Sequence, residues 1–114
     1  MIMIKAYISR NALGEVCGFK VEDHGDPIVC SAVSALCINT VNSIEQFTDL
    51  DFSLDASQDG GDMLFTLPYL ENGGEDERAC LLLNSLVLGL KQIELDYNND
   101  LKVFDQEVQN NVKN

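Results

Sequence analysis

A histidine and a cysteine stand close together in the first third of the chain. His24, the only histidine, lies six positions before Cys30. Between them, Asp26 and Pro27 form a strong helix start, in which the carboxylate caps the helix and proline takes its first position. Cys30 then falls in the first helical turn. An imidazole and a thiolate are the minimum parts of nucleophilic cysteine chemistry, so this segment is the candidate active site.

The predicted helix start favours the thiolate form of Cys30, because free backbone N–H groups and the helix dipole stabilise an anion in the first turn. Ser34 lies one turn further on the same face, so its hydroxyl could hydrogen-bond the sulfur or a reacting oxygen. Backbone N–H groups near the helix start could form an oxyanion hole. Glu22 or Asp23 could orient the imidazole of His24.

The other cysteines predict no further chemistry. Buried free cysteine behaves as a small hydrophobe, and we expect this of Cys37 and Cys80. No disulfide framework is expected in a chain that can bury its own core and shows no secretion signal. Neither a metal nor a cofactor is expected, because Cys30 and Cys37 would lie about 10 Å apart along one helix and no Cys-x-x-Cys pair occurs. A redox-sensing thiol would lack a nearby resolving cysteine.

The composition predicts one folded domain with basic partners. The 114 residues are 46% apolar and carry a formal net charge of −12, which opposes direct binding to nucleic acid or to an anionic membrane. No apolar run approaches the roughly 18 residues of a membrane span. Residues 1–8 resemble a strand and lack the features of a signal peptide, so we expect a cytoplasmic protein.

Alternating and helical apolar patterns predict the order strand, strand, helix, strand, strand, helix, strand. The expected strands cover about 2–9, 16–21, 52–57, 63–67 and 101–104, and the expected helices about 27–47 and 78–97. The simplest packing is an α+β domain of two layers over residues 1–104, with a mainly antiparallel sheet and both helices on one face. Residues 105–114 are expected to form a polar tail. Leu81, Leu88 and Leu95 make the second helix more apolar than one sheet face requires.

Residues 28–36, with the sequence Ile-Val-Cys-Ser-Ala-Val-Ser-Ala-Leu, resemble the signature of the ribosomal-processing cysteine proteases, the Prp or YsxB-like family. Residues 18–25 look like the strand and histidine that precede this signature. The Asp59-Gly60-Gly61 hairpin and the leucine-rich second helix match as well. The resemblance extends to about Phe104.

The resemblance implies a cysteine protease that removes the short N-terminal extension of a large-subunit ribosomal protein, so that the mature protein can enter the ribosome. It assigns Cys30 as the nucleophile and His24 as the base, and Ser34 matches the serine that the family has one turn on. Family members are typically homodimers with a mobile, glycine-rich loop between histidine and cysteine. The implied partners are therefore a second copy and the precursor of a basic ribosomal protein.

Two departures from the family pattern concern the approach to Cys30. The loop is several residues shorter, and only Gly25 gives it glycine freedom. Pro27 stands where the family has an aspartate three positions before the cysteine, and Asp26 is displaced by one position. These differences leave a second interpretation open, in which the chain is a non-catalytic homodimeric module that binds a basic or extended peptide.

Overall fold

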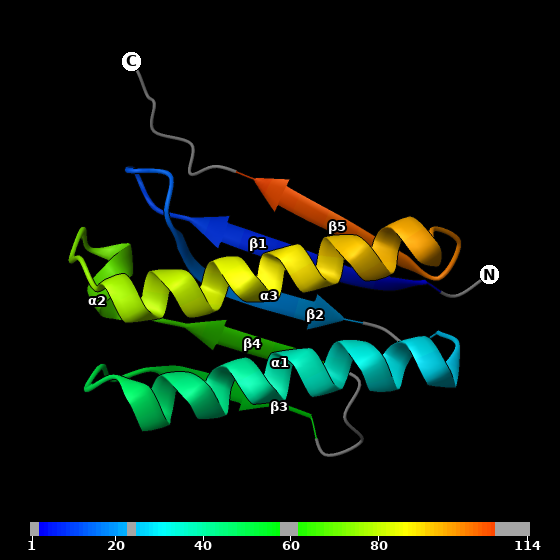
Figure 1. The fold of residues 1–114 in the computed structure, drawn as a ribbon, viewed down its shortest axis with the longest axis horizontal. Coiled ribbons are helices and arrows are strands. Elements are labelled where there is room, and N and C mark those ends of the chain that lie inside the picture. The colour runs from blue at the N-terminus through cyan, green and yellow to red at the C-terminus, as the bar shows by residue number, and fades with distance from the viewer. Residues whose placement is uncertain (1–2, 23–24, 58–61, 107–114) are drawn as a thin grey trace.

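The computed structural model describes residues 3–22, 25–57 and 62–106. They form a five-stranded sheet with two long helices lying over one of its faces (Figure 1). The strands are β1 (Ile4–Arg10), β2 (Val16–Glu22), β3 (Ser53–Ala56), β4 (Met63–Thr66) and β5 (Leu101–Gln106), and the helices are α1 (Pro27–Phe47), α2 (Pro68–Glu71) and α3 (Glu77–Asp96). The predicted two-layer α+β architecture is confirmed.

The strands lie in the order β3-β4-β2-β1-β5. Neighbouring strands are antiparallel except at one edge, where β5 runs parallel to β1. The prediction of a mainly antiparallel sheet is therefore confirmed, and the sheet is mixed because of this single parallel pair.

The central strands bury one face against the helices. The alternating residues of β1 and β2 that lie on this face are all buried, namely Ile4, Ala6, Ile8, Cys17, Phe19 and Val21. Gly18 lies directly against the backbone of β4, because a Cβ at this position would lie 2.5 Å from the backbone oxygen of Phe65. Only glycine fits this position without moving the backbone of β4.

The long helices run antiparallel to each other (Figure 1). They pack closely at Gly89 of α3, where a Cβ would lie 2.9 Å from Cδ1 of Leu36 in α1. The short helix α2 was not predicted. It begins at Pro68, a residue whose fixed φ and missing N–H suit the first helical position.

The apolar surface of α3 exceeds what the core uses, as the sequence predicts. Leu83, Leu86 and Leu90 are buried, whereas Leu81, Leu88 and Leu95 are 71%, 62% and 72% exposed. The three exposed leucines recur every seven residues, so they align on one side of the helix. We call Leu81, Leu88 and Leu95 the leucine stripe.

The last strand is longer than predicted, because β5 continues two residues beyond Phe104. Asp105 accepts hydrogen bonds from Nε and Nη2 of Arg10 at 2.6 and 2.8 Å and from Nζ of Lys91 at 2.9 Å. The Arg10 guanidinium, with help from Lys91, lowers the pKa of Asp105 to about 2. The carboxylate therefore stabilises this edge above about pH 4, and the stabilisation is lost as the pH falls towards 2. Residues 107–114 lie outside the described residues.

By length and composition, α1 is the one described helix that is long and apolar enough to cross a membrane. Polar residues such as Ser31, Thr40 and Asn42 interrupt its apolar sequence, so it contains no long uninterrupted apolar run. Core helices pass the same test, and Val33, Cys37, Val41 and Ile44 of α1 are buried in the core of this domain.

Candidate active site

The start of α1 has the geometry that Asp26 and Pro27 predict. Oδ1 of Asp26 accepts hydrogen bonds from the N–H groups of Ile28 at 2.9 Å and Val29 at 3.2 Å. Cys30 is the fourth residue of the helix, and its N–H donates to the carbonyl oxygen of Asp26 at 2.8 Å. Asp26 thus fixes the first turn and, with it, the position of Cys30.

Two of the predicted site residues lie on consecutive turns of α1. Cys30 and Ser34 are both half-buried, and Cys30 packs against the edge of the hydrophobic core. A thiol in this position is held in place and is still accessible to a reagent or a peptide. His24 and Asp23 lie outside the described residues, so the pairing of His24 with Cys30 stays a prediction.

The expected oxyanion hole is not formed by the first turn of α1. Proline at position 27 has no N–H, and the N–H groups of Ile28 and Val29 already donate to the Asp26 carboxylate. The N–H of Cys30 is used within the helix. The N–H groups of the first turn are therefore not free, because the capping carboxylate itself occupies the anion position. An oxyanion hole formed by other N–H groups near the helix start stays a prediction.

Cys80 holds the same helical position in α3 that Cys30 holds in α1. It is the fourth residue after the capping Asp76, and its N–H donates to the Asp76 carbonyl oxygen at 3.0 Å. Burial, a hydrogen bond with Glu15 and the charge of Glu15 nevertheless raise the pKa of Cys80 to about 11. A place in the first helical turn is therefore not enough to make a cysteine reactive, and the neighbouring side chains decide the outcome.

The two remaining thiols are also held in their protonated form. Burial raises the pKa of Cys37 to about 12. Burial and the negative charge of Glu71 raise the pKa of Cys17. All four cysteines are free, and the structural role predicted for Cys37 and Cys80 agrees with these environments.

We expect iodoacetamide to alkylate Cys30 well before the other three cysteines at pH 7.5. The thiolate is the reactive species, so Cys17, Cys37 and Cys80 should label appreciably only as the pH rises beyond about 9. Peptide mapping by mass spectrometry after timed labelling would give the four rates. A Cys30 that labels no faster than Cys80 would contradict its assignment as a nucleophile.

The segment that leads into α1 lies against the beginning of β1 and the residue just before β5. A Cβ on Gly25 would lie 3.2 Å from Cγ1 of Ile4 in β1 and 3.6 Å from the backbone oxygen of Asp100, just before β5. The N–H of Ile4 also donates to the Asp100 oxygen at 3.0 Å. Figure 1 shows the start of α1, the end of α3 and the beginning of β5 at the same end of the sheet.

A cavity of about 410 Å³ lies at this end of the sheet, between the ends of β2 and β3 and the start of β4. Lys20 and Glu22 line it. Glu22 accepts a hydrogen bond from the hydroxyl of Tyr7 at 3.0 Å and pairs with Nζ of Lys20 at 3.4 Å. Both carboxylate oxygens of Glu22 therefore have partners on the sheet, which favours a structural role over the orientation of His24. The cross-strand pair of Tyr7 and Lys20 was not singled out in the sequence.

Comparisons with known proteins agree with this geometry. The chain is 29% identical over 107 residues to the ribosomal processing cysteine protease Prp of Bacillus subtilis (strain 168), covering 89% of this chain and 96% of that protein. The crystal structure of the ribosomal processing protease Prp from S. aureus, in complex with a covalently linked product peptide, matches with a TM-score of 0.81 and 25% identity. It covers 91% of this chain and 100% of that one. SMU.848 from Streptococcus mutans matches with a TM-score of 0.80 and 29% identity, over 93% and 96% of the two chains.

The family model of the cysteine protease Prp matches residues 3–102. This match includes every described strand and helix except the end of β5. It also includes the helix start at Asp26 and the half-buried Cys30. The chain therefore belongs to the cysteine protease Prp family.

Proposed function

We propose that this protein removes the N-terminal extension of a large-subunit ribosomal protein before that protein is built into the ribosome. The observation that carries the proposal is the half-buried Cys30 in the first turn of α1, within a chain of the Prp family. The similar protease from S. aureus has been crystallised with a substrate peptide and with a covalently linked product peptide.

In the proposed reaction, Cys30 and His24 act as nucleophile and base. His24 takes the thiol proton, and the sulfur attacks the scissile carbonyl carbon to form a tetrahedral intermediate. His24 returns the proton to the leaving amine as the C–N bond breaks, which leaves a thioester. Water then adds to the thioester carbonyl with His24 as base, and cleavage of the C–S bond releases the acid and restores the thiol.

Two further residues support this chemistry. In this scheme the hydroxyl of Ser34, one turn from Cys30, donates to the sulfur or to a reacting oxygen. Asp26 holds the first turn through its two side-chain hydrogen bonds. Neither residue exchanges a proton with the substrate in this scheme.

A peptide that covers the extension and the first residues of the mature ribosomal protein tests the proposal. Incubation with the protein should yield two fragments whose masses add to that of the peptide plus one water, with a single cleavage position. An unchanged peptide after prolonged incubation at neutral pH would contradict proteolysis.

A non-catalytic binding module is the second candidate, and one observation favours it. The Asp26 carboxylate occupies the N–H groups at the start of α1, where an oxyanion would otherwise be stabilised. In that case the protein would bind the same peptide through the same end of the sheet without cleaving it. Peptide binding without product formation would favour this candidate.

Replacing Asp26 with asparagine should raise the alkylation rate of Cys30 about three- to tenfold. Asparagine caps a helix about as well as aspartate, so stability should change by less than about 0.5 kcal/mol. The variant removes the negative charge that opposes a thiolate in the same turn. Asp76→Asn makes the same change at the equivalent cap of α3. It is the matched control and should leave the alkylation rate of Cys30 as it is in the parent. Equal rates for Cys30 in the parent and in Asp26→Asn would show that the cap does not restrain the thiol.

We further propose that the protein is a homodimer that uses the leucine stripe. Three leucines on one side of α3 are 62–72% exposed. Such a row of exposed apolar side chains is unfavourable in water and usually marks an interface with another protein. A twofold axis would place the same stripe of each copy against the other.

Leu88→Lys, at the centre of the leucine stripe, should weaken dimerisation at least about tenfold, because it buries an unpaired charge in the interface. Sedimentation velocity at micromolar concentration would then show a shift from dimer to monomer. Leu13→Lys is the control, since Leu13 is 64% exposed and lies in the β1–β2 turn. A parent protein that sediments only as a monomer would contradict the proposal.

The charge of −12 favours a basic ribosomal protein as the direct partner. It disfavours direct binding to nucleic acid or to an anionic membrane surface. Ribosomal precursors are made and assembled in the cytoplasm, so we place the protein there.

A further inference from the structure

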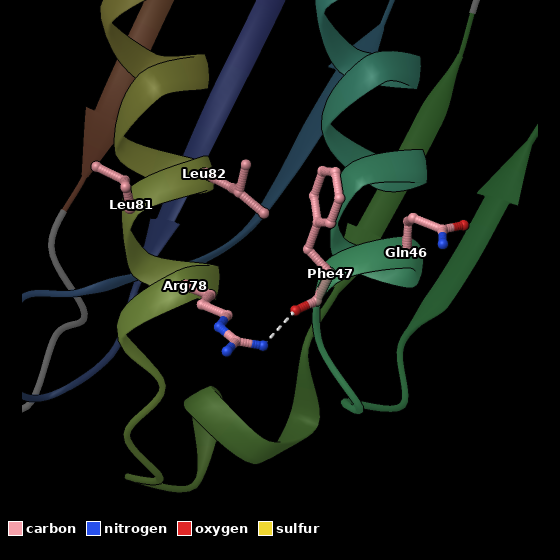
Figure 2. Close-up of a pocket in the computed structure, with 5 residues that line it drawn as sticks. All are labelled: Gln46, Phe47, Arg78, Leu81 and Leu82. Carbon is pink, nitrogen blue, oxygen red and sulfur yellow. Dashed lines mark hydrogen bonds between the residues drawn. The ribbon is translucent and has the colours of Figure 1, made fainter.

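An apolar groove opens between the end of α1 and the beginning of α3. It encloses about 410 Å³ and is lined by Gln46, Phe47, Arg78, Leu81 and Leu82. Figure 2 shows Phe47 and Leu82 on the two sides of the groove, one from each helix. Phe47 is 57% exposed, which is a large aromatic surface to leave in water.

A hydrogen bond links the two helices at the edge of the groove. Nη1 of Arg78 donates to the carbonyl oxygen of Phe47 at 3.2 Å (Figure 2). This bond ties the last residue of α1 to the first turn of α3. The guanidinium is thereby held at the edge of the groove.

The groove is distant from the candidate active site. Cys30 is the fourth residue of α1 and Phe47 is the last. At about 1.5 Å per residue, they are about 25 Å apart along the helix axis. The groove is therefore a separate surface and not a part of the cleavage site.

Acidic side chains border the groove. A neighbouring cavity of about 370 Å³ shares Arg78 with it and is lined by Asp49, Glu75, Asp76 and Glu77 as well. The Asp76 carboxylate caps α3 through the N–H of Ala79 at 2.9 Å. The carboxylates of Asp49, Glu75 and Glu77 belong to exposed residues. The apolar groove complements a segment with a large apolar side chain. The three exposed acids beside it complement basic side chains in the same segment.

We infer that this groove binds a basic, apolar-anchored segment of the mature part of the ribosomal precursor. The inference rests on the proposed function. In the groove itself, which exposed acids border, a second copy of this chain is the poorer occupant, because its charge of −12 would bring acid against acid. The homodimer proposed above is centred on Leu88 and shares only Leu81 with the groove. About eight extended residues span the 25 Å to Cys30. A substrate held at the groove thus presents its extension to Cys30 at a raised effective concentration.

Two variants change the apolar part and the acidic part of this surface separately, and each has a matched control. Phe47→Ser removes the apolar anchor, and Leu13→Ser makes the same type of change at an exposed residue of the β1–β2 turn. Glu75→Lys reverses one acid, and Glu71→Lys gives the same change in net charge on α2, outside both the groove and the cavity near Cys30. All four positions are exposed, so the fold should be retained, and circular dichroism would verify it.

We expect Phe47→Ser and Glu75→Lys to lower kcat/KM for the intact precursor about tenfold each. Cleavage of a short peptide that contains only the extension and the junction should not change. The control variants should process both substrates like the parent. Raising the salt concentration should slow processing of the precursor more than that of the peptide, because salt screens charge pairs over about 8 Å at physiological ionic strength.

Direct binding separates this inference from the proposed function. The mature ribosomal protein, which lacks the extension and cannot be cleaved, should bind the parent protein and bind Phe47→Ser about tenfold more weakly in a fluorescence anisotropy titration. This result would stand even if no peptide were cleaved. Equal binding and processing by parent and variants would overturn the inference. A Phe47→Ser protein that loses its dimer would also overturn it, because the groove would then be a contact between copies.

Discussion

Cys30→Ser should reduce cleavage of the precursor peptide by at least about a thousandfold, the usual scale for loss of a covalent nucleophile. A serine hydroxyl at this position has a much higher pKa than a thiol and lacks the third group that activates serine in hydrolases. Initial rates from quantitative mass spectrometry of the two fragments would measure the loss. The variant changes one half-buried atom, so its unfolding midpoint should stay close to that of the parent.

Cys80→Ser is the matched control for this prediction. Cys80 occupies the same turn of α3 that Cys30 occupies in α1, but Glu15 and burial hold its thiol protonated. Cleavage by Cys80→Ser should therefore equal that of the parent. Substantial cleavage by Cys30→Ser, or its loss in Cys80→Ser alone, would refute the assignment of the nucleophile.

Gly18→Val should destabilise the domain by about 3 kcal/mol or more, or prevent folding altogether. The Cβ alone would lie 2.5 Å from the backbone oxygen of Phe65. Both strands are hydrogen-bonded neighbours inside the sheet, so the clash cannot be relieved by a side-chain rotation. Urea unfolding followed by circular dichroism would show the change as a lower midpoint.

Ser9→Val is the control for Gly18→Val. Ser9 is exposed and pairs with Gly18 across β1 and β2, and valine suits an exposed strand position. The unfolding midpoint of Ser9→Val should stay close to that of the parent, as expected of an ordinary surface substitution. A Gly18→Val protein as stable as the parent would mean that β2 and β4 are further apart than the structure places them.

The elements that could be predicted from the sequence are those with strong local signals. Asp26 and Pro27 mark the start of α1 because capping and a fixed φ act within a few residues. Alternation in β1 and β2 identifies their buried face because a strand repeats every two residues. The short helix α2 escaped prediction because four residues are too few to show a helical period.

Long-range features could not be predicted in the same way. The extension of β5 to Asp105 depends on Arg10, which lies 95 positions earlier in the chain. The parallel pairing of β5 with β1 is likewise set by packing and not by any local pattern.

The candidate site was predictable in part. Spacing alone placed Cys30 and Ser34 on one face of a helix, and the structure places them there. The consequence of the cap was missed, although the residue was identified. Asp26 satisfies the N–H groups of Ile28 and Val29, so those groups cannot also serve an oxyanion while the carboxylate stays in place.

The contacts of Gly25 determine when during synthesis the site can be completed. Gly25 rests on Ile4, from the first strand, and on Asp100, which precedes the last strand. A growing chain therefore lacks one support of the segment before Cys30 until residue 100 of the 114 has been made and is free to fold. We therefore expect a chain that ends before Asp100 to hold the segment before Cys30 less precisely than the full chain does.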